Sequence, residues 1–293
     1  MNPFVERYQK MESTFNADVT LQSCLRVNTL RTTPQDILAR LTSKKVELEK
    51  VPYLDFGHFF HADFSLGATP EYLLGYYYLQ EAASQLPVQV LQPQAGETVL
   101  DMAASPGSKT TQIAQYMQNK GAIIALDNHP MRLNALRNNI ERMGVTNTII
   151  FKKDARFAFD LGMQFDKILL DAPCSGNFAK EKKFFELKTV EGARQMARTQ
   201  KELLTAALKC LKPNGILVYS TCSLEPEENE MNMEWLLKKF SVQLEKINLD
   251  IGDEGLTNIF GEELSLEIKK TVRLWPHKTG TEGFFIAKIR KIQ

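Results

Sequence analysis

Apolar, β-branched runs alternate with segments of helical periodicity between residues 98 and 223. Amphipathic stretches such as KTTQIAQYMQ and PMRLNALRNNIERMG, in which apolar residues recur every three to four positions, separate these runs. Strands that alternate with helices are typical of βαβ units, so the pattern predicts a doubly wound, mostly parallel α/β sheet. The predicted strands are TVLDMAA, AIIALD, TIIFKKD, KILLDAP and ILVYSTCS, and GFFIAKIRKI near the C-terminus is expected to add an antiparallel edge strand.

The first part of the chain shows shorter and more mixed elements. The pattern of SCLRVNTL predicts a strand, and TPQDILARLTSK predicts a helix with Thr33 as N-cap and Pro34 in the first turn. GYYYLQEAASQL predicts a second helix that ends at Pro87. Because the regular alternation starts only after this point, we expect an N-terminal α+β domain over residues 1–87 and the α/β sheet domain over residues 88–293.

The composition is that of a soluble globular protein. Of the 293 residues, 43% are hydrophobic and 24% are charged, which excludes disorder, collagen and a coiled coil as descriptions of the whole chain. No apolar run approaches the ~18 residues of a membrane span, and the N-terminal MNPFVERYQK lacks the apolar core of a secretory signal. The cysteines form no CxxC pair, and His58 and His61 have no further ligands nearby, so we expect no metal, no membrane and a reducing, cytoplasmic location.

The formal net charge of +1 hides an uneven distribution along the chain. Residues 177–212 hold nine Lys or Arg against four Asp or Glu, and residues 265–293 hold seven against two, whereas residues 224–263 hold three against eleven. Basic faces suit a polyanion, although solvated helix faces are the commoner explanation. Phe184 and Phe185 lie among lysines, which suits base stacking on a nucleic acid or, equally, the start of an amphipathic helix.

A turn of small residues follows the first strand of the sheet and opens a helix. Such a turn lets main-chain N–H groups approach a ligand closely. It fails the pattern G-x-x-x-x-G-K-[ST], because Ala103 and Ser108 replace both glycines, and it fails G-x-G-x-x-G, because only Gly107 is present. An ATPase and an NAD enzyme are therefore disfavoured. The candidate cofactor loop comprises Ala103, Ala104, Ser105, Pro106, Gly107, Ser108 and Lys109.

Three aspartates end successive predicted strands, where ligands of open α/β sheets bind. Asp127 is placed to accept hydrogen bonds from two ribose hydroxyls and Asp154 from an adenine amino group, and Asp171 ends the next strand. A single Asp at such a position is more often a turn former or a helix cap. S-adenosylmethionine carries a ribose, an adenine amine and an ammonium group, so the set of three favours this cofactor.

Two of the four cysteines also follow predicted strands. Cys174 lies in DAPCSG after the fourth strand and Cys222 in STCS at the end of the fifth, so both thiols are expected at the face of the sheet that holds the cofactor loop. Cys24 and Cys210 lie on amphipathic elements and are expected to be small core residues. Two thiols beside a methyl donor suit methylation at carbon 5 of cytosine, because addition of a thiolate at carbon 6 makes carbon 5 nucleophilic.

With these residues in place, the chain resembles the Sun/Nop family of RNA cytosine-5 methyltransferases. The matching segments run in the family's order and cover nearly the whole chain. DAPCSG together with TCS and the PGSK turn is a specific combination. The segments are RVNTL, QEAASQL, LDMAASPGSKTTQIA, LLDAPCSG, YSTCSLEPEENE and RLWPHKTGTEGFFIAKI.

The resemblance implies catalytic roles for four residues. Cys222 matches the family's nucleophile, and Cys174 matches the second cysteine, which is needed to release the methylated product. Asp171 matches the carboxylate that contacts the target cytosine and lies near the methionine end of the cofactor. Lys109 matches a lysine that helps to hold the target base.

The resemblance also implies the cofactor contacts. The turn from Ala103 to Lys109 matches the cofactor loop, Asp127 the ribose ligand and Asp154 the adenine-side ligand. Arg132 falls where a further cofactor contact is often found. The chain departs from the family pattern in reading PGSK where many members have PGGK, and Ala103 stands where many have cysteine, so this residue is not expected to do chemistry.

The fold implied is a Rossmann-like, doubly wound methyltransferase sheet with a small N-terminal α+β, RRM-like domain that contacts RNA. The implied function is S-adenosylmethionine-dependent RNA cytosine-5 methylation by a monomer, with tRNA as the substrate and ribosomal RNA as the leading alternative. Two other readings stay open. DAPC loosely resembles the D/N-P-P-Y/F element of amino-group methyltransferases, and a non-catalytic RNA-binding scaffold would keep the same fold.

Overall fold

The computed structural model describes residues 2–292, which form two compact units by their backbone contacts. Unit A contains residues 22–155 and 165–169, and unit B contains residues 2–21, 156–164 and 170–292. The predicted boundary at residue 87 between two domains stays a prediction.

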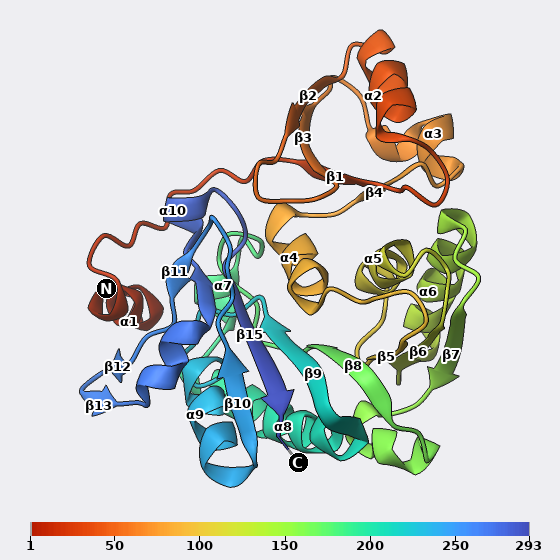
Figure 1. The fold of residues 1–293 in the computed structure, drawn as a ribbon. Helices are drawn as coiled ribbons and strands as arrows, with labels where there is room; N and C mark the ends of the chain where they lie inside the picture. The colour runs from red at the N-terminus through yellow and green to blue at the C-terminus, as the bar shows by residue number, and fades with distance from the viewer. Residues whose placement is uncertain (1, 293) are drawn as a thin grey trace. The chain divides into compact units, whose positions relative to one another are not determined.

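Unit A begins with a four-stranded antiparallel sheet in the order β2-β3-β1-β4 (Figure 1). The helices α2 and α3 fall between β1 and β2 and between β3 and β4. This β-α-β-β-α-β succession is that of ferredoxin-like folds, to which the RRM belongs, and it agrees with the RRM-like expectation. The bounds are β1 Cys24–Val27, α2 Pro34–Ser43, β2 Glu47–Lys50, β3 Gly57–His61, η1 Leu66–Ala68, α3 Pro70–Leu73 and β4 Tyr77–Leu79.

Helix α2 begins as predicted, because the Thr33 hydroxyl accepts a hydrogen bond from the main-chain N–H of Asp36. The helix predicted over GYYYLQEAASQL is wrong in its first half, where Tyr77 pairs with Val27 of β1. The helix that follows, α4 (Ala82–Leu91), contains Pro87 instead of ending at it. Proline removes one N–H from a helix, and α4 continues through it because the side chains on either side are buried.

The remaining strands of unit A are parallel. β5 pairs with β6 and with the first part of β8, and β6 pairs with β7. Helices α5 and α6 connect β5, β6 and β7 and pack on one another (Figure 1). This is the βαβ arrangement expected from the sequence. The bounds are β5 Thr98–Asp101, α5 Ser108–Tyr116, β6 Ala122–Asp127, α6 Pro130–Met143, β7 Thr148–Lys152 and β8 Phe165–Asp171.

Unit B is built on β9 (Leu211–Thr221), which pairs antiparallel with β15 (Phe284–Lys291). β15 is antiparallel as expected, but it is not an edge strand. β14 (Val272–Leu274) and β10 (Val242–Glu245) pair with its other side, and β11 (Asp253–Glu254) pairs with β14. These partners are too short to show a clear alternation in the sequence.

The helices of unit B pack beside these strands, with α8 in contact with β9 and α9 in contact with α8 and β10. The mixed sheet, the connecting helices and the N-terminal α+β portion make up the Rossmann-like methyltransferase fold that the sequence predicts. Among residues 2–292, no helix is long and apolar enough to cross a membrane. The further elements are α1 Pro3–Met11, η2 Ala155–Leu161, α7 Phe184–Leu187, α8 Val190–Cys210, α9 Glu230–Lys239, β12 Asn258–Ile259, β13 Glu262–Glu263, η3 Leu266–Lys270 and α10 Pro276–Thr279.

An aromatic cluster in unit B joins the N-terminal helix α1 to the segment that follows Cys174. Phe184 is only 1% exposed and its ring lies 5.1 Å from that of Phe4. It is therefore not available to stack on a nucleic acid, and its alternative role as the apolar side of a helix start is correct. Phe185 stacks on Phe178 with ring centres 5.4 Å apart. The cluster consists of Phe4, Tyr8, Phe15, Phe178, Phe184, Leu224 and Trp275.

Candidate active site

The two cysteines that follow strands lie side by side in unit B. Cys174 comes three residues after the end of β8 and Cys222 directly after β9, and their sulfur atoms are 3.1 Å apart. The main-chain N–H of Ala172 donates to the carbonyl of Ser220, which holds the two chain segments together just before the thiols. Both cysteines are half-buried and reduced. The sequence therefore placed the thiol pair correctly at the ends of these strands.

The pKa of the Cys174 thiol is raised by a different leading cause from those of Cys24 and Cys210. The hydrogen bond with Cys222 is the largest cause that raises the pKa of Cys174, followed by burial and by the negative charge of Glu228. Burial raises the pKa of Cys24 to about 12 and that of Cys210 to about 11. Cys24 and Cys210 are buried core residues, as expected.

Polar groups around the pair fix the main chain on both sides. Asp171, the last residue of β8, accepts a 2.8 Å hydrogen bond from the hydroxyl of Ser220. The side-chain amide of Asn177 donates to the carbonyl of Cys222 at 2.8 Å. Gly176 adopts φ +82°, and a Cβ atom there would lie 2.0 Å from a carboxylate oxygen of Glu181, so the turn after Cys174 requires glycine.

A carboxylate that the sequence reasoning did not single out lies behind the thiols. Glu228 is fully buried and accepts hydrogen bonds from the hydroxyl and the main-chain N–H of Ser175, the residue after Cys174. It also accepts a 2.7 Å hydrogen bond from the hydroxyl of Ser223, the residue after Cys222, and one of 2.7 Å from the side-chain amide of Gln200. The only sequence signal for Glu228 was the run of acidic residues in LEPEENE, but such a run is typical of an exposed charged loop.

Two other carboxylates of this run are also buried, and each is paired with an arginine. Glu230 pairs with Arg273, with no side-chain exposure on either residue, and Arg273 also donates to the carbonyl of Leu224. Glu225 pairs with Arg7 of α1 at 3.0 Å. These pairs anchor the segment that follows Cys222 from two directions, and breaking either would leave an uncompensated buried charge.

The predicted cofactor loop lies in unit A and ends at the first turn of α5. Gly107 is the N-cap residue with φ +108°, a conformation that side chains rarely adopt, and a Cβ atom there would approach Leu136 to 3.1 Å. The hydroxyl oxygen of Ser105 is buried and has no hydrogen-bond partner among the described residues. An orphaned polar atom in a loop of small residues at a helix N-terminus fits a polar ligand.

The other predicted site residues of unit A lie at the end of this loop or later in the chain. Lys109 is buried and its ammonium group donates to the hydroxyl of Ser84 at 3.1 Å. Asp127 is the last residue of β6 and is buried, and one of its carboxylate oxygens accepts a 2.7 Å hydrogen bond from the N–H of His129. Asp154 is half-buried two residues beyond β7, and Arg132 is exposed on the first turn of α6. The roles of these residues stay predictions.

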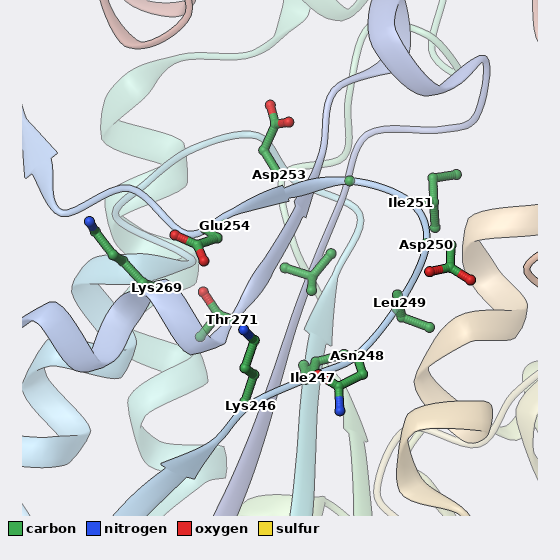
Figure 2. Close-up of a pocket in the computed structure, with 12 residues that line it drawn as sticks. Lys246, Ile247, Asn248, Leu249, Asp250, Ile251, Asp253, Glu254, Lys269 and Thr271 are labelled. Carbon is green, nitrogen blue, oxygen red and sulfur yellow. The ribbon is translucent and has the colours of Figure 1, made fainter.

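A surface cavity of about 540 Å³ opens on unit B beside β10 and β11. Residues 246–254 line it together with Lys269, Thr271 and Val272, and Figure 2 shows its lysine and carboxylate side chains pointing in different directions around the loop. None of the predicted site residues lines it. Among the described residues, no group of three or more His, Cys, Asp or Glu side chains is placed to hold a metal ion.

Comparisons with known proteins agree with this architecture. A family model described as 16S rRNA methyltransferase RsmB/F matches residues 88–290, and the N-terminal domain of 16S rRNA methyltransferase RsmF matches residues 2–82. The tRNA (cytosine(49)-C(5))-methyltransferase of Pyrococcus abyssi is 42% identical over 98% of this chain and 95% of its own length.

Two solved structures from Pyrococcus horikoshii share the fold over almost the whole chain. A methyltransferase homolog protein superposes with a TM-score of 0.91 at 43% identity, covering 98% of this chain and 94% of that one. NSun6, solved with SFG, gives a TM-score of 0.84 at 29% identity, covering 98% and 95%. The chain therefore belongs to the RsmB/F, or Sun/Nop, family of RNA cytosine-5 methyltransferases.

Proposed function

We propose that Cys222 and Cys174 divide the chemistry of an S-adenosylmethionine-dependent tRNA cytosine-5 methyltransferase. The observation that carries the proposal is the 3.1 Å separation of the two sulfur atoms at the ends of β8 and β9. A single buried cysteine has an ordinary explanation as a core residue. That explanation does not account for two half-buried thiols in hydrogen-bond contact, with polar groups that hold the chain around them.

Cys222 is the nucleophile in this proposal. Its sulfur forms a bond to carbon 6 of cytosine, and the electron pair released into the ring makes carbon 5 nucleophilic. The cofactor supplies an electrophilic methyl group. Carbon 5 then carries both the methyl group and its original hydrogen, and loss of that proton to a base returns the electron pair that expels the Cys222 sulfur. The ring regains its aromaticity and the product leaves.

Cys174 acts at the release step. In the free protein the hydrogen bond with Cys222 keeps the pKa of Cys174 high, so Cys174 holds its proton. In the covalent adduct the Cys222 sulfur is bonded to carbon, so the thiol hydrogen bond that does most to raise the pKa of Cys174 is lost. Cys174 then becomes easier to deprotonate at the stage of the reaction that needs a base.

Asp171 and Lys109 are assigned to the target base. A carboxyl group at the end of β8 is suited to hydrogen bonds with N3 and the exocyclic amine of cytosine, which stabilise the activated ring. Ser220 orients this carboxyl group from β9. Lys109, the second residue of α5, is buried and is also assigned to hold the base.

The residues of unit A fit S-adenosylmethionine by their donor chemistry. Asp127 is assigned to the ribose hydroxyls, Asp154 to the adenine side and Arg132 to a further contact. The loop from Ala103 to Lys109 would hold the cofactor with main-chain N–H groups and with the orphaned hydroxyl of Ser105. Asp171 would also face the methionine end.

The proposal also names the RNA substrate, the cellular location and the oligomeric state. One relative that matches nearly the full length of both chains, from Pyrococcus abyssi, is named as a tRNA methyltransferase, which favours tRNA. The family models are described as 16S rRNA methyltransferases, and ribosomal RNA is therefore the second candidate. We propose that the protein acts as a cytoplasmic monomer.

The test is methyl transfer to separate pools of tRNA and ribosomal RNA, with the modified base identified by mass spectrometry. The wild-type protein should form 5-methylcytosine in tRNA, and Cys222→Ser should form none. Cys210→Ser, which changes a buried cysteine of α8, is the matched control and should retain activity. Methylation by Cys222→Ser, or methylation on an amino group, would contradict the thiol mechanism, and modification of ribosomal RNA alone would overturn the choice of tRNA.

A further inference from the structure

The carboxylate of Glu228 joins the two chain segments that carry the thiols. One oxygen accepts hydrogen bonds from the hydroxyls of Ser175 and Ser223, and the other accepts from the N–H of Ser175 and the side-chain amide of Gln200. The two hydroxyl oxygens are also 3.0 Å from each other. Ser175 and Ser223 directly follow Cys174 and Cys222, so a single side chain ties together the residues next to both sulfurs.

Gln200 extends the same connection to the other side of Cys174. Its side-chain amide donates both to Glu228 and to the carbonyl of Pro173, the residue before Cys174. Its own oxygen accepts from Asn232 of α9. The position of Cys174 is therefore held from the residue before it, by Gln200, and from the residue after it, by Glu228, and Gln200 is itself hydrogen-bonded to the Glu228 carboxylate.

Glu228 differs from its buried neighbours in that it has no cationic partner within residues 2–292. Glu225 and Glu230 each pair with an arginine, whereas the groups that hydrogen-bond to Glu228 are hydroxyls and amides. Burial raises the pKa of Glu228, as it does that of Glu225, which reflects the cost of placing a carboxylate in the interior. A carboxylate kept at such a cost beside reactive groups points to a role at the site rather than in stability alone.

We propose that Glu228 is a positioning residue for the thiol pair, which sets the separation of the two sulfurs by holding Ser175 and Ser223 on one carboxylate. This inference deepens the proposed function and rests on it for its importance to catalysis. The positioning itself is a property of the free protein. It can therefore be measured without RNA and without a cofactor.

The experiment uses the thiol oxidant diamide to compare how closely the two sulfur atoms are held in different variants. Diamide takes two hydrogens from two neighbouring thiols, so that a disulfide forms and the diazene becomes a hydrazine. The rate at which the Cys174–Cys222 disulfide forms is followed by peptide mass. This rate depends on how closely the two sulfur atoms are held. Wild-type protein is compared with Glu228→Ala, Glu228→Gln and Ser223→Ala. Tyr77→Phe is the control, because it removes a buried hydrogen bond with Thr69 in the four-stranded sheet of unit A.

We expect disulfide formation in Glu228→Ala to be slower by about tenfold or more, since several hydrogen bonds to a charged group are lost. Glu228→Gln, which keeps one acceptor oxygen, and Ser223→Ala should fall between it and the wild type, and Tyr77→Phe should match the wild type. Wild-type rates in both Glu228 variants would overturn the inference. If Glu228→Ala does not fold, a wild-type rate in Ser223→Ala overturns it in the same way.

The outcome is separable from the test of the proposed function. If the wild-type protein methylates cytosine through Cys222 but the Glu228 variants oxidise at the normal rate, only the positioning role is wrong. If the Glu228 variants oxidise slowly but Cys222→Ser still methylates RNA, the positioning of the pair stands as a structural fact and the thiol mechanism is wrong.

Discussion

The guanidinium group of Arg26 donates a 2.7 Å hydrogen bond to the main-chain oxygen of Ser108, the first residue of α5. Arg26 lies on β1 of the RRM-like sheet and is fully buried. It also donates to the hydroxyl of Thr111 at 2.8 Å and to the side-chain oxygen of Gln80 at 2.9 Å. Within unit A, the RRM-like sheet thus fixes the helix that begins at the predicted cofactor loop.

Replacing Arg26 should therefore disturb the loop as well as the fold. In Arg26→Met, three buried acceptors lose a charged donor, so we expect the free energy of unfolding to fall by about 2–4 kcal/mol. S-adenosylmethionine affinity should fall as well, because the start of α5 is no longer held. Urea unfolding and calorimetric titration measure the two effects. Arg137→Met, on the exposed side of α6, is the control, and equal behaviour of the two variants would refute the coupling.

The proposed ribose contact of Asp127 predicts a specific loss of cofactor binding. Asp127→Asn keeps an oxygen that can accept the hydrogen bond from His129 but loses the negative charge. Removing the charge from an acceptor of two hydroxyl groups should weaken S-adenosylmethionine binding by about tenfold to a hundredfold. Titration calorimetry gives the affinity, with the exposed Asp63→Asn as control. Unchanged affinity in Asp127→Asn would show that the residue only forms the turn.

Exposed lysines after the Cys174 loop are expected to contact RNA phosphates. Lys182 and Lys183 are exposed and precede the buried Phe184. The double change of both lysines to Ala should weaken RNA binding and lower the slope of log affinity against log salt by about 1–2, because each phosphate contact releases a counterion. The matched control changes Lys238 and Lys239 of α9, in the acidic segment. An unchanged slope in the first variant would place the RNA elsewhere.

The ion pair between Glu12 and Lys278 predicts a pH-dependent stability. Burial alone would raise the pKa of Glu12, but hydrogen bonds from Lys278 and Thr14 outweigh it and lower the pKa to about 2. A carboxyl whose pKa is lowered by folding adds stability above its ordinary pKa of 4.5 and loses it as the pH falls towards 2.

Glu12→Gln should accordingly be less stable than the wild type at pH 7, by up to about 1 kcal/mol for a pair that is partly open to solvent. Thermal unfolding from pH 7 down to pH 2 should show the difference shrinking below pH 4.5 until the two melting temperatures meet. If the difference in melting temperature between the two proteins stays constant over this range, the ionised carboxylate of Glu12 contributes nothing to stability.

The sequence predicted the parts of the site that depend on where parallel strands end. Asp171 ends β8, Cys174 comes shortly after it and Cys222 follows β9, and local patterns locate these strand ends well. The same logic predicted a loop of small residues leading into a helix, and residues 103–109 lead into α5. Tyr77 was misread as helical because aromatic residues at that spacing suit either element, and its pairing with Val27 of β1 decides between them.

The supporting groups could not be predicted in this way. Glu228 meets Ser175 across a separation of 53 residues, and Arg26 meets Ser108 across 82. Such contacts follow from how the elements pack, and nothing in the local periodicity distinguishes a buried carboxylate from an exposed one. The burial of Phe184 has the same origin, since its partner Phe4 lies on the N-terminal helix.

The most direct test of the account is whether a covalent bond forms between Cys222 and RNA. In Cys174→Ala, addition to cytosine and methyl transfer should proceed but release should fail. Incubation with S-adenosylmethionine and tRNA should therefore accumulate an adduct that survives a denaturing gel and maps to Cys222 by peptide mass. It should be absent when Cys222 is also replaced by Ser. A Cys174→Ala protein that turns over normally without any adduct would contradict the division of labour between the two thiols.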